Sequence, residues 1–201
     1  LEAGGTWLGV GANGRFAALT NIRDPHRPPG RKSRGELVAR FLTGELTIDD
    51  YLADVVDRSL EYGGFNLLVG NPHELWHFNQ RESEAVMLAP GVYGLSNAGL
   101  DTPWPKLLKA RAALSEVLDD PQPQALLALL SDAQTAPFAE LPDTGVGLAT
   151  ETLLSSVFIA SQSYGTRAST ALIVQADGTR HIVERSFGPY GGHLGEVEIR
   201  I

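Results

Sequence analysis

Two histidines and a glutamate stand close together at residues 73–77, which read HELWH and match the H-E-x-x-H pattern of many zinc peptidases. In those enzymes both imidazoles project from one face of a helix, one turn apart, beside a glutamate that acts as general base. Here the pattern follows a turn-forming Asn71-Pro72 pair, and residues 74–80, ELWHFNQ, alternate as in a strand. In a strand, residues four apart stand roughly 13 Å apart, too far to share one zinc ion. The sequence therefore predicts a hairpin strand that binds no zinc.

A second motif, Gly9-Val10-Gly11-Ala12-Asn13-Gly14, matches the G-x-G-x-x-G loop of dinucleotide-binding proteins. That loop must open a helix, because the helix N-terminus holds the pyrophosphate. Here the motif precedes residues 15–22, RFAALTNI, which are rich in strand formers. The glycines are therefore expected to serve a hairpin turn, and no nucleotide is predicted.

The elements that would position such residues can be predicted from alternation and turn signals. The Asn13-Gly14 pair favours a tight hairpin with strands over 6–8 and 15–22, and the Asp177-Gly178 pair favours one with strands over 169–175 and 180–187. Two further strands are expected in the apolar segment 65–70 and in the alternating segment 195–201. Helical spacing predicts a helix over 36–42, which a capping box at Ser33 begins and Gly44 ends. A second helix is expected to begin at Thr47, and two more are expected over 107–118 and 124–130. Hairpins with helices segregated between them indicate an α+β fold.

The composition restricts the class of partner. The 201 residues carry a formal net charge of −8, which argues against a nucleic-acid partner, since phosphate binding needs a concentrated basic surface. The basic cluster Arg27–Arg34 is interpreted as a solvated loop. Because the chain has no cysteine, disulfides and thiol catalysis are excluded within these residues. No apolar run reaches membrane-spanning length, and the expected location is the cytoplasm.

Four segments together resemble the NRDE-motif family, that is, proteins similar to transport and Golgi organisation 2. They are GGTWLGVGANGRFAALTN (4–21), SRGELVARFLTG (33–44), GFNLLVGN with PGVYGLSNAGLDTPWPK (64–71 and 90–106), and SSVFI with YGTRAST (155–159 and 164–170). Family members begin with a cysteine and carry an Asn-Arg-Asp-Glu motif upstream of the Gly-Gly-Thr-Trp stretch. Neither feature is present here. The resemblance therefore implies a single domain over 1–201 that lacks its N-terminal segment.

The family is in turn similar to the N-terminal-nucleophile hydrolases. This similarity implies a four-layer αββα sandwich that here misses its N-terminal strand region, and a site built around a terminal cysteine acting as nucleophile and base. By resemblance, Asn21 and Asn97 occupy the places of oxyanion-hole asparagines, and Arg167 the place of a late site arginine. Taken singly, an asparagine at a strand end is a common turn former, and an arginine a common surface residue.

Four further residues near these segments are candidates for contact with a ligand. Trp7, Trp104 and Tyr164 could line a pocket or pack in the core. Arg23 could pair with Asp24 at the rim of a pocket or belong to a solvated loop.

The resemblance implies a ligand-binding or trafficking protein that handles haem or an acyl lipid or acyl-CoA in a hydrolase-like pocket. No cofactor is assigned, but for haem as a transported ligand the candidate axial residues are His73, His77 and His181. The alternative is a cysteine amidohydrolase that acts on C–N amide bonds and is inactive without its cysteine. A third hypothesis is a purely structural domain.

Overall fold

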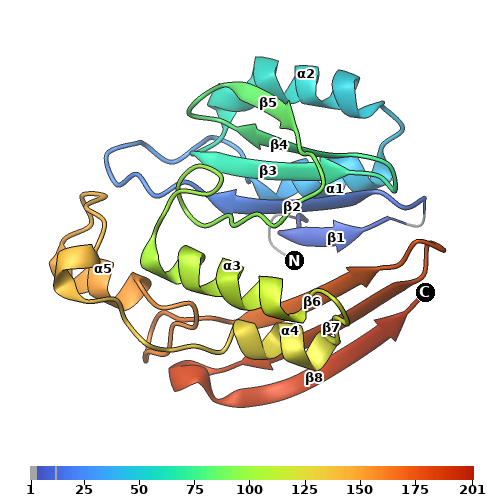
Figure 1. Ribbon diagram of the computed structural model, residues 1–201. Helices are drawn as coiled ribbons and strands as arrows, with labels where there is room; N and C mark the ends of the chain where they lie inside the picture. Colours follow the sequence, from blue (N-terminus) through green and yellow to red (C-terminus); the bar gives the residue numbers. More distant parts are fainter. Residues whose placement is uncertain (1–3, 12) are drawn as a thin grey trace. The chain divides into compact units, whose positions relative to one another are not determined.

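The computed structural model describes residues 4–11 and 13–201. The chain divides into two compact units, Leu1–Thr102 and Pro103–Ile201, which are treated separately below. Figure 1 shows the elements of each unit.

The first unit contains a five-stranded antiparallel sheet in the order β1-β2-β3-β4-β5. Its strands follow one another along the chain, so each is hydrogen-bonded to its neighbour in sequence: β1 Leu8–Val10, β2 Phe16–Asn21, β3 Phe65–Gly70, β4 Leu75–Asn79 and β5 Glu84–Met87. The β1–β2 hairpin turns at Gly14, which has a φ of 84° and so adopts a conformation that favours glycine. The Gly9–Gly14 motif thus leads into a strand, as the sequence predicts.

Two helices pack on one face of this sheet, α1 Gly35–Thr43 and α2 Ile48–Arg58. Thr47 caps α2 as expected, because its side chain accepts a hydrogen bond from the Asp50 amide. The capping box predicted at Ser33 is wrong. Helix α1 begins after Arg34 without a side-chain cap, and the Glu36 amide donates to the backbone carbonyl of Ser33 instead. The helix ends at Gly44, whose amide donates to the Arg40 carbonyl 2.9 Å away.

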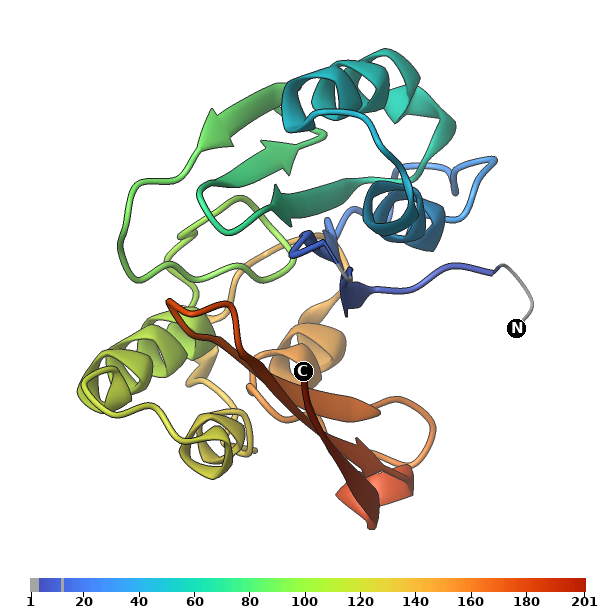
Figure 2. The same ribbon diagram turned by 90° about the vertical axis from the view of Figure 1, so that its right-hand side faces the viewer.

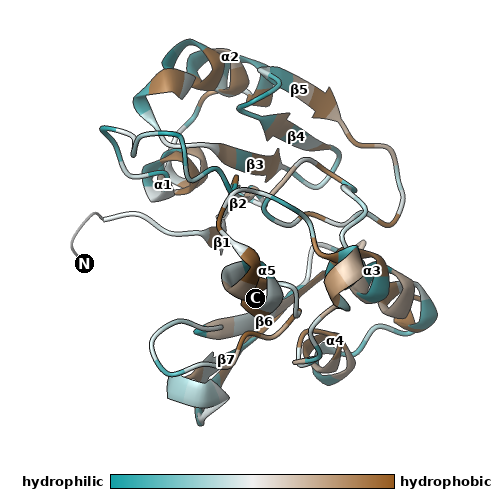
Figure 3. Ribbon diagram, turned by 90° about the vertical axis from the view of Figure 1, so that its left-hand side faces the viewer, coloured by the Kyte–Doolittle hydropathy of each residue, from teal (hydrophilic) through white to brown (hydrophobic). Residues whose placement is uncertain are grey.

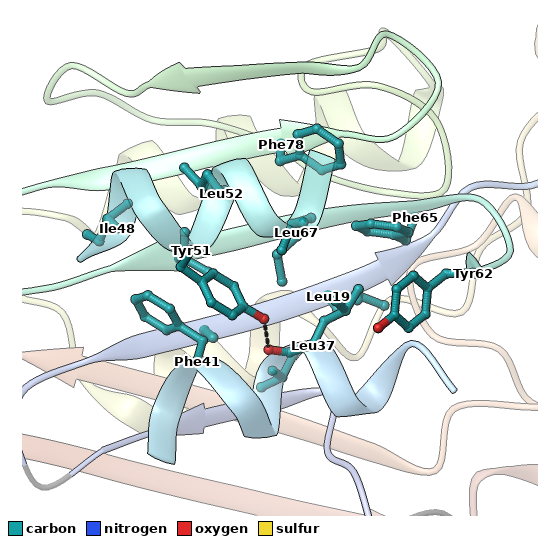
Figure 4. Packing of buried hydrophobic residues seen from close by; sticks show 14 residues of the cluster. Leu19, Leu37, Phe41, Ile48, Tyr51, Leu52, Tyr62, Phe65, Leu67 and Phe78 are labelled. Carbon is teal, nitrogen blue, oxygen red and sulfur yellow. Dashed lines mark hydrogen bonds between the residues drawn. The ribbon is translucent and has the colours of Figure 1, made fainter. Parts of the chain in front are cut away.

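The main core lies between these helices and the sheet (Figure 4). Alternate residues of β2 and β3 point toward the helices, where Tyr51 and Phe41 place their ring centroids 5.0 Å apart. The Tyr51 hydroxyl donates to the Leu37 carbonyl and so ties α2 to α1. Burying each large apolar side chain contributes roughly 1.5–3 kcal/mol. Figure 3 shows most of β3 as hydrophobic, consistent with this position.

The HELWH segment is not helical. Its second half belongs to β4, in which His77 pairs with Leu68 of β3, and its first half forms the β3–β4 turn, closed by the Asn71 amide donating to the Glu74 carbonyl 3.0 Å away. The prediction of a hairpin strand is confirmed for residues 75–77. The absence of zinc binding stays a prediction.

The second unit contains a three-stranded antiparallel sheet in the order β6-β7-β8, formed by Ala168–Val174, Arg180–Phe187 and His193–Arg200. Gly178, with a φ of 86°, closes the predicted β6–β7 hairpin. Helices α3 Pro105–Val117 and α4 Pro123–Leu129 lie on one side of this twisted sheet (Figures 1 and 2). Leu127 of α4 packs against Ala171 and Val183.

Two elements were not predicted, β5 and the seven-residue helix α5 Leu148–Leu154. The described residues also form three short 3₁₀ helices: η1 Ser59–Glu61, η2 Phe138–Glu140 and η3 Pro189–Gly191. Every strand pair is antiparallel, so the α+β class is confirmed within the described residues. The four-layer sandwich and the single-domain boundaries stay predictions. Over the same part of the chain, no helix combines the length and apolar character that crossing a membrane requires.

Candidate functional site

Asn21 and Asn97, the two asparagines singled out by resemblance, lie together in the first unit. Asn21 is the last residue of β2, and its backbone carbonyl accepts a hydrogen bond from Nδ2 of Asn97 at 2.9 Å. The carbonyl of Asn97 in turn accepts the Arg23 amide at 2.7 Å. Two hydrogen bonds therefore join three residues predicted for the site, although Asn21 and Asn97 lie 76 positions apart in the chain.

The loop that carries Asn97 is fixed to the sheet on both sides of that residue. The Thr20 hydroxyl donates to the Ser96 carbonyl at 2.7 Å, and Nδ2 of Asn66 donates to the Ala98 carbonyl at 2.7 Å. Two backbone carbonyls that flank Asn97 thus receive side-chain donors from β2 and β3. This anchoring fixes the loop around Asn97 against the sheet.

A row of buried polar side chains lies beneath this loop. Thr20, Asn66 and Asn79 are register neighbours on β2, β3 and β4 and so share one face of the sheet. Asn66 is completely buried; its Nδ2 also donates to the Thr20 hydroxyl at 3.2 Å, and its Oδ1 accepts from Asn79 at 3.0 Å and from Nε2 of His77 at 3.2 Å. Sequence reasoning missed this network. The available signal was an asparagine inside the otherwise apolar strand FNLLVG.

Asn21 itself has an unusual acceptor. Its side-chain oxygen Oδ1 is buried and accepts no hydrogen bond from the residues that the structure describes. Such an unpaired buried acceptor costs about 1–3 kcal/mol, and most native structures hold few of them. Because this atom belongs to a residue that the resemblance also selects, it is the strongest indication of a ligand site in the first unit.

The histidines give little support for a haem or metal site. Burial lowers the pKa of His77 below its ordinary value of 6.5, so the ring is neutral near pH 7, with Nε2 directed at Asn66. Nε2 of His181 lies 2.7 Å from Oε1 of Glu198. His73 lies in the β3–β4 turn, where its amide donates to Asn71. Within the described part of the chain, no three metal-binding side chains of the His, Cys, Asp or Glu type gather at one point.

The other residues predicted for the site are spread over both units. Trp7, half-exposed in the first unit, lies with its ring 6.0 Å from the Arg34 guanidinium carbon. In the second unit, Trp104 directly precedes α3, and Tyr164 and Arg167 lie exposed in the segment before β6. The Arg167 carbonyl accepts the Phe187 amide at 2.8 Å. A common pocket for Asn21, Asn97 and Arg167 stays a prediction.

Asp24, expected either to pair with Arg23 or to be solvated, instead pairs with Arg81, whose guanidinium nitrogen lies 3.0 Å from the carboxylate.

Comparisons with known proteins agree with the resemblance drawn from the sequence. A family model described as "Transport and Golgi organisation 2" matches residues 1–189. The chain is 38% identical to the Transport and Golgi organization protein 2 homolog of Bos taurus and 36% identical to that of Homo sapiens; each match covers 92% of this chain and 73% of the relative. The Transport and Golgi organization 2 homolog of Mus musculus is 33% identical with the same coverage.

Proposed function

Because the chain belongs to the Transport and Golgi organisation 2 family, we propose that it binds a small acyl compound at Asn21 and Asn97 and acts in that family as a ligand-binding or trafficking protein. The observation that carries this proposal is the buried Oδ1 of Asn21, which lacks a donor. An N–H group of a ligand placed beside this buried atom would supply the missing hydrogen bond.

The chemistry of Asn21 favours one ligand class. A carboxamide offers an acceptor, Oδ1, and a donor, Nδ2, on the same planar group. The N–H of an N-acyl amide can donate to Oδ1; because such an amide is trans, its carbonyl points to the opposite side and does not compete for this atom. Haem offers its propionates, which are acceptors only at neutral pH, and these would leave Oδ1 unpaired. The site therefore favours an amide-bearing acyl compound over haem.

Asn97 bonds to the backbone of Asn21 and so does not compete with a ligand for the side chain of Asn21. One Nδ2 proton of Asn97 is used on the Asn21 backbone carbonyl, and this bond fixes the turn after β2. Since the bond goes to the backbone, Asn21→Ala removes the carboxamide of Asn21 and keeps this contact. It also removes a buried acceptor that has no partner, so the free protein should be as stable as the parent or slightly more stable.

The test compares two probes that differ by one N–H group. N-dodecanoylglycine and the ester dodecanoyl glycolate carry the same chain, carbonyl and carboxylate, but only the first donates. Isothermal titration of the purified chain should give roughly tenfold weaker binding of the ester, about the loss of one hydrogen bond to a buried acceptor. In Asn21→Ala this difference between the probes should vanish.

The matched control is Asn13→Ala, which alters an exposed asparagine in the β1–β2 turn and should preserve the preference for the amide. Haemin, titrated in parallel, measures the competing ligand class. Equal affinity of the parent for amide and ester, or a preference that survives in Asn21→Ala, would contradict the proposal.

A further inference from the structure

We propose a second binding site in the first unit, for a phosphate group, in a cavity formed by the loop 24–34 against residues 63–64. The cavity has a volume of about 410 Å³, within the range of small-molecule sites. Three cationic side chains line it, those of Arg27, Lys32 and Arg34, together with the ring of Trp7. Neither Asn21 nor Asn97 lines this cavity, so the site is separate from the one described above.

The wall of the cavity is held in place at both of its ends. The Ile22 amide donates to the Gly64 carbonyl at 2.9 Å, and the Lys32 amide donates to the Glu61 carbonyl at 3.1 Å. Between them, Gly30 lies so close to the backbone that a Cβ atom there would come within 2.2 Å of the Gly63 nitrogen. Three prolines stiffen the same loop, Pro25, Pro28 and Pro29. The cavity is therefore formed before any ligand arrives.

Two of the three cations keep an uncompensated charge. Lys32 pairs with Glu61 at 2.5 Å, and the one lining carboxylate, Asp24, pairs with Arg81. Among the described residues, the guanidinium groups of Arg27 and Arg34 have no carboxylate within ion-pair distance. Both are partly buried, which makes an unpaired cation costly and an incoming anion favourable.

Neutral partners fix the direction of both guanidinium groups. Arg27 donates to Oε1 of the buried Gln80 at 2.5 Å, and Gln80 is itself oriented by its Nε2, which donates to the Ser59 carbonyl at 3.4 Å. Arg34 donates to the Gly64 carbonyl at 3.0 Å. A guanidinium has five N–H donors, so each arginine retains several for a ligand. Burial lowers the pKa of Arg34 from its ordinary value, but the group stays charged.

This arrangement identifies the ligand by charge and geometry. Planar guanidinium forks match the oxygens of a phosphate bidentately, and two forks can compensate its two charges. The net charge of −8 of the whole chain repels anions in general, so binding of a phosphate here must depend on the local charge of Arg27 and Arg34. The half-exposed Trp7 ring adds a surface on which a planar group attached to the phosphate can stack. The segment Arg27–Arg34 is a loop, as the sequence predicts, and Arg31 is exposed, whereas Arg27 and Arg34 are only partly exposed.

The experiment titrates the purified chain with inorganic phosphate and with adenosine monophosphate, using calorimetry at low ionic strength. Arg27→Gln removes one lining cation, and Arg31→Gln removes the same charge from the exposed part of the same loop. We expect Arg27→Gln to weaken binding of both probes about tenfold or more, and Arg31→Gln to weaken it less than threefold, since a distant exposed charge is screened. Arg27→Lys, which keeps the charge and loses the fork, should bind with an intermediate affinity and guards against misfolding of the glutamine variant.

The two probes separate the possible sources of the phosphate. Tighter binding of adenosine monophosphate than of phosphate, lost in Trp7→Ala, would support a phosphomonoester with a stacked ring; equal binding would support a site for the phosphate group alone. The proposal is overturned if neither probe binds the parent chain at millimolar concentration, or if Arg27→Gln and Arg31→Gln weaken binding equally.

Discussion

Replacing Asn66 by alanine should destabilise the first unit more than any single polar change near the candidate site. The substitution removes four hydrogen bonds from a completely buried side chain, those to Thr20, Ala98, Asn79 and His77. At about 0.5–1.5 kcal/mol each, the loss of unfolding free energy is roughly 2–6 kcal/mol, with a central value of about 4. For a chain of this size that corresponds to a fall in Tm of roughly 10 °C.

The assay is thermal and urea unfolding of the parent, Asn66→Ala and the exposed control Asn13→Ala. Hydrogen exchange should in addition show faster exchange in the loop around Asn97, because Asn66 anchors the Ala98 carbonyl. A loss of less than about 1 kcal/mol for Asn66→Ala, equal to that of the control, would refute the reasoning that this network carries the loop.

Two further predictions concern single side chains. Burial lowers the pKa of His77 below the 6.5 of the unfolded chain, so the unfolded state binds more protons as the pH falls. The contribution of His77 to the unfolding free energy should therefore be constant above pH 6.5 and be lost as the pH drops below it. His77→Gln should flatten this pH dependence in urea melts between pH 7 and 5. Elemental analysis of the purified chain should find no stoichiometric zinc; zinc that disappears in His77→Ala would contradict the strand geometry of residues 75–77.

Local signals were sufficient for most of the fold. The hairpins at Asn13-Gly14 and Asp177-Gly178 follow from the backbone conformation that glycine permits, and both Gly14 and Gly178 have positive φ. Thr47 caps its helix for an equally local reason. Strand β5 was missed because its four residues are mostly exposed and show no apolar alternation, and α5 because it begins without a capping side chain or a first-turn proline.

Features that depend on contacts distant in sequence could not be predicted in this way. Ser33 fails to cap α1 although its local sequence fits a capping box. The cavity around Arg27 and Arg34 depends on the close approach of Gly30 to Gly63, which no pattern within the loop announces. The same holds for the Asn66 network, whose partners lie on three strands and a loop. Resemblance to the family, rather than periodicity, selected Asn21 and Asn97.

The most direct test of ligand binding at Asn21 and Asn97 is to follow their side-chain amide signals by nitrogen–proton NMR while N-dodecanoylglycine is added. If the ligand supplies the donor that Oδ1 of Asn21 lacks, the Asn21 signals should shift saturably with the calorimetric affinity, and those of Asn97 should follow because its amide is bonded to Asn21. The signals of the turn residues Asn13 and Asn71 should stay in place. Saturable binding that moves other signals and leaves Asn21 and Asn97 unchanged would contradict the account.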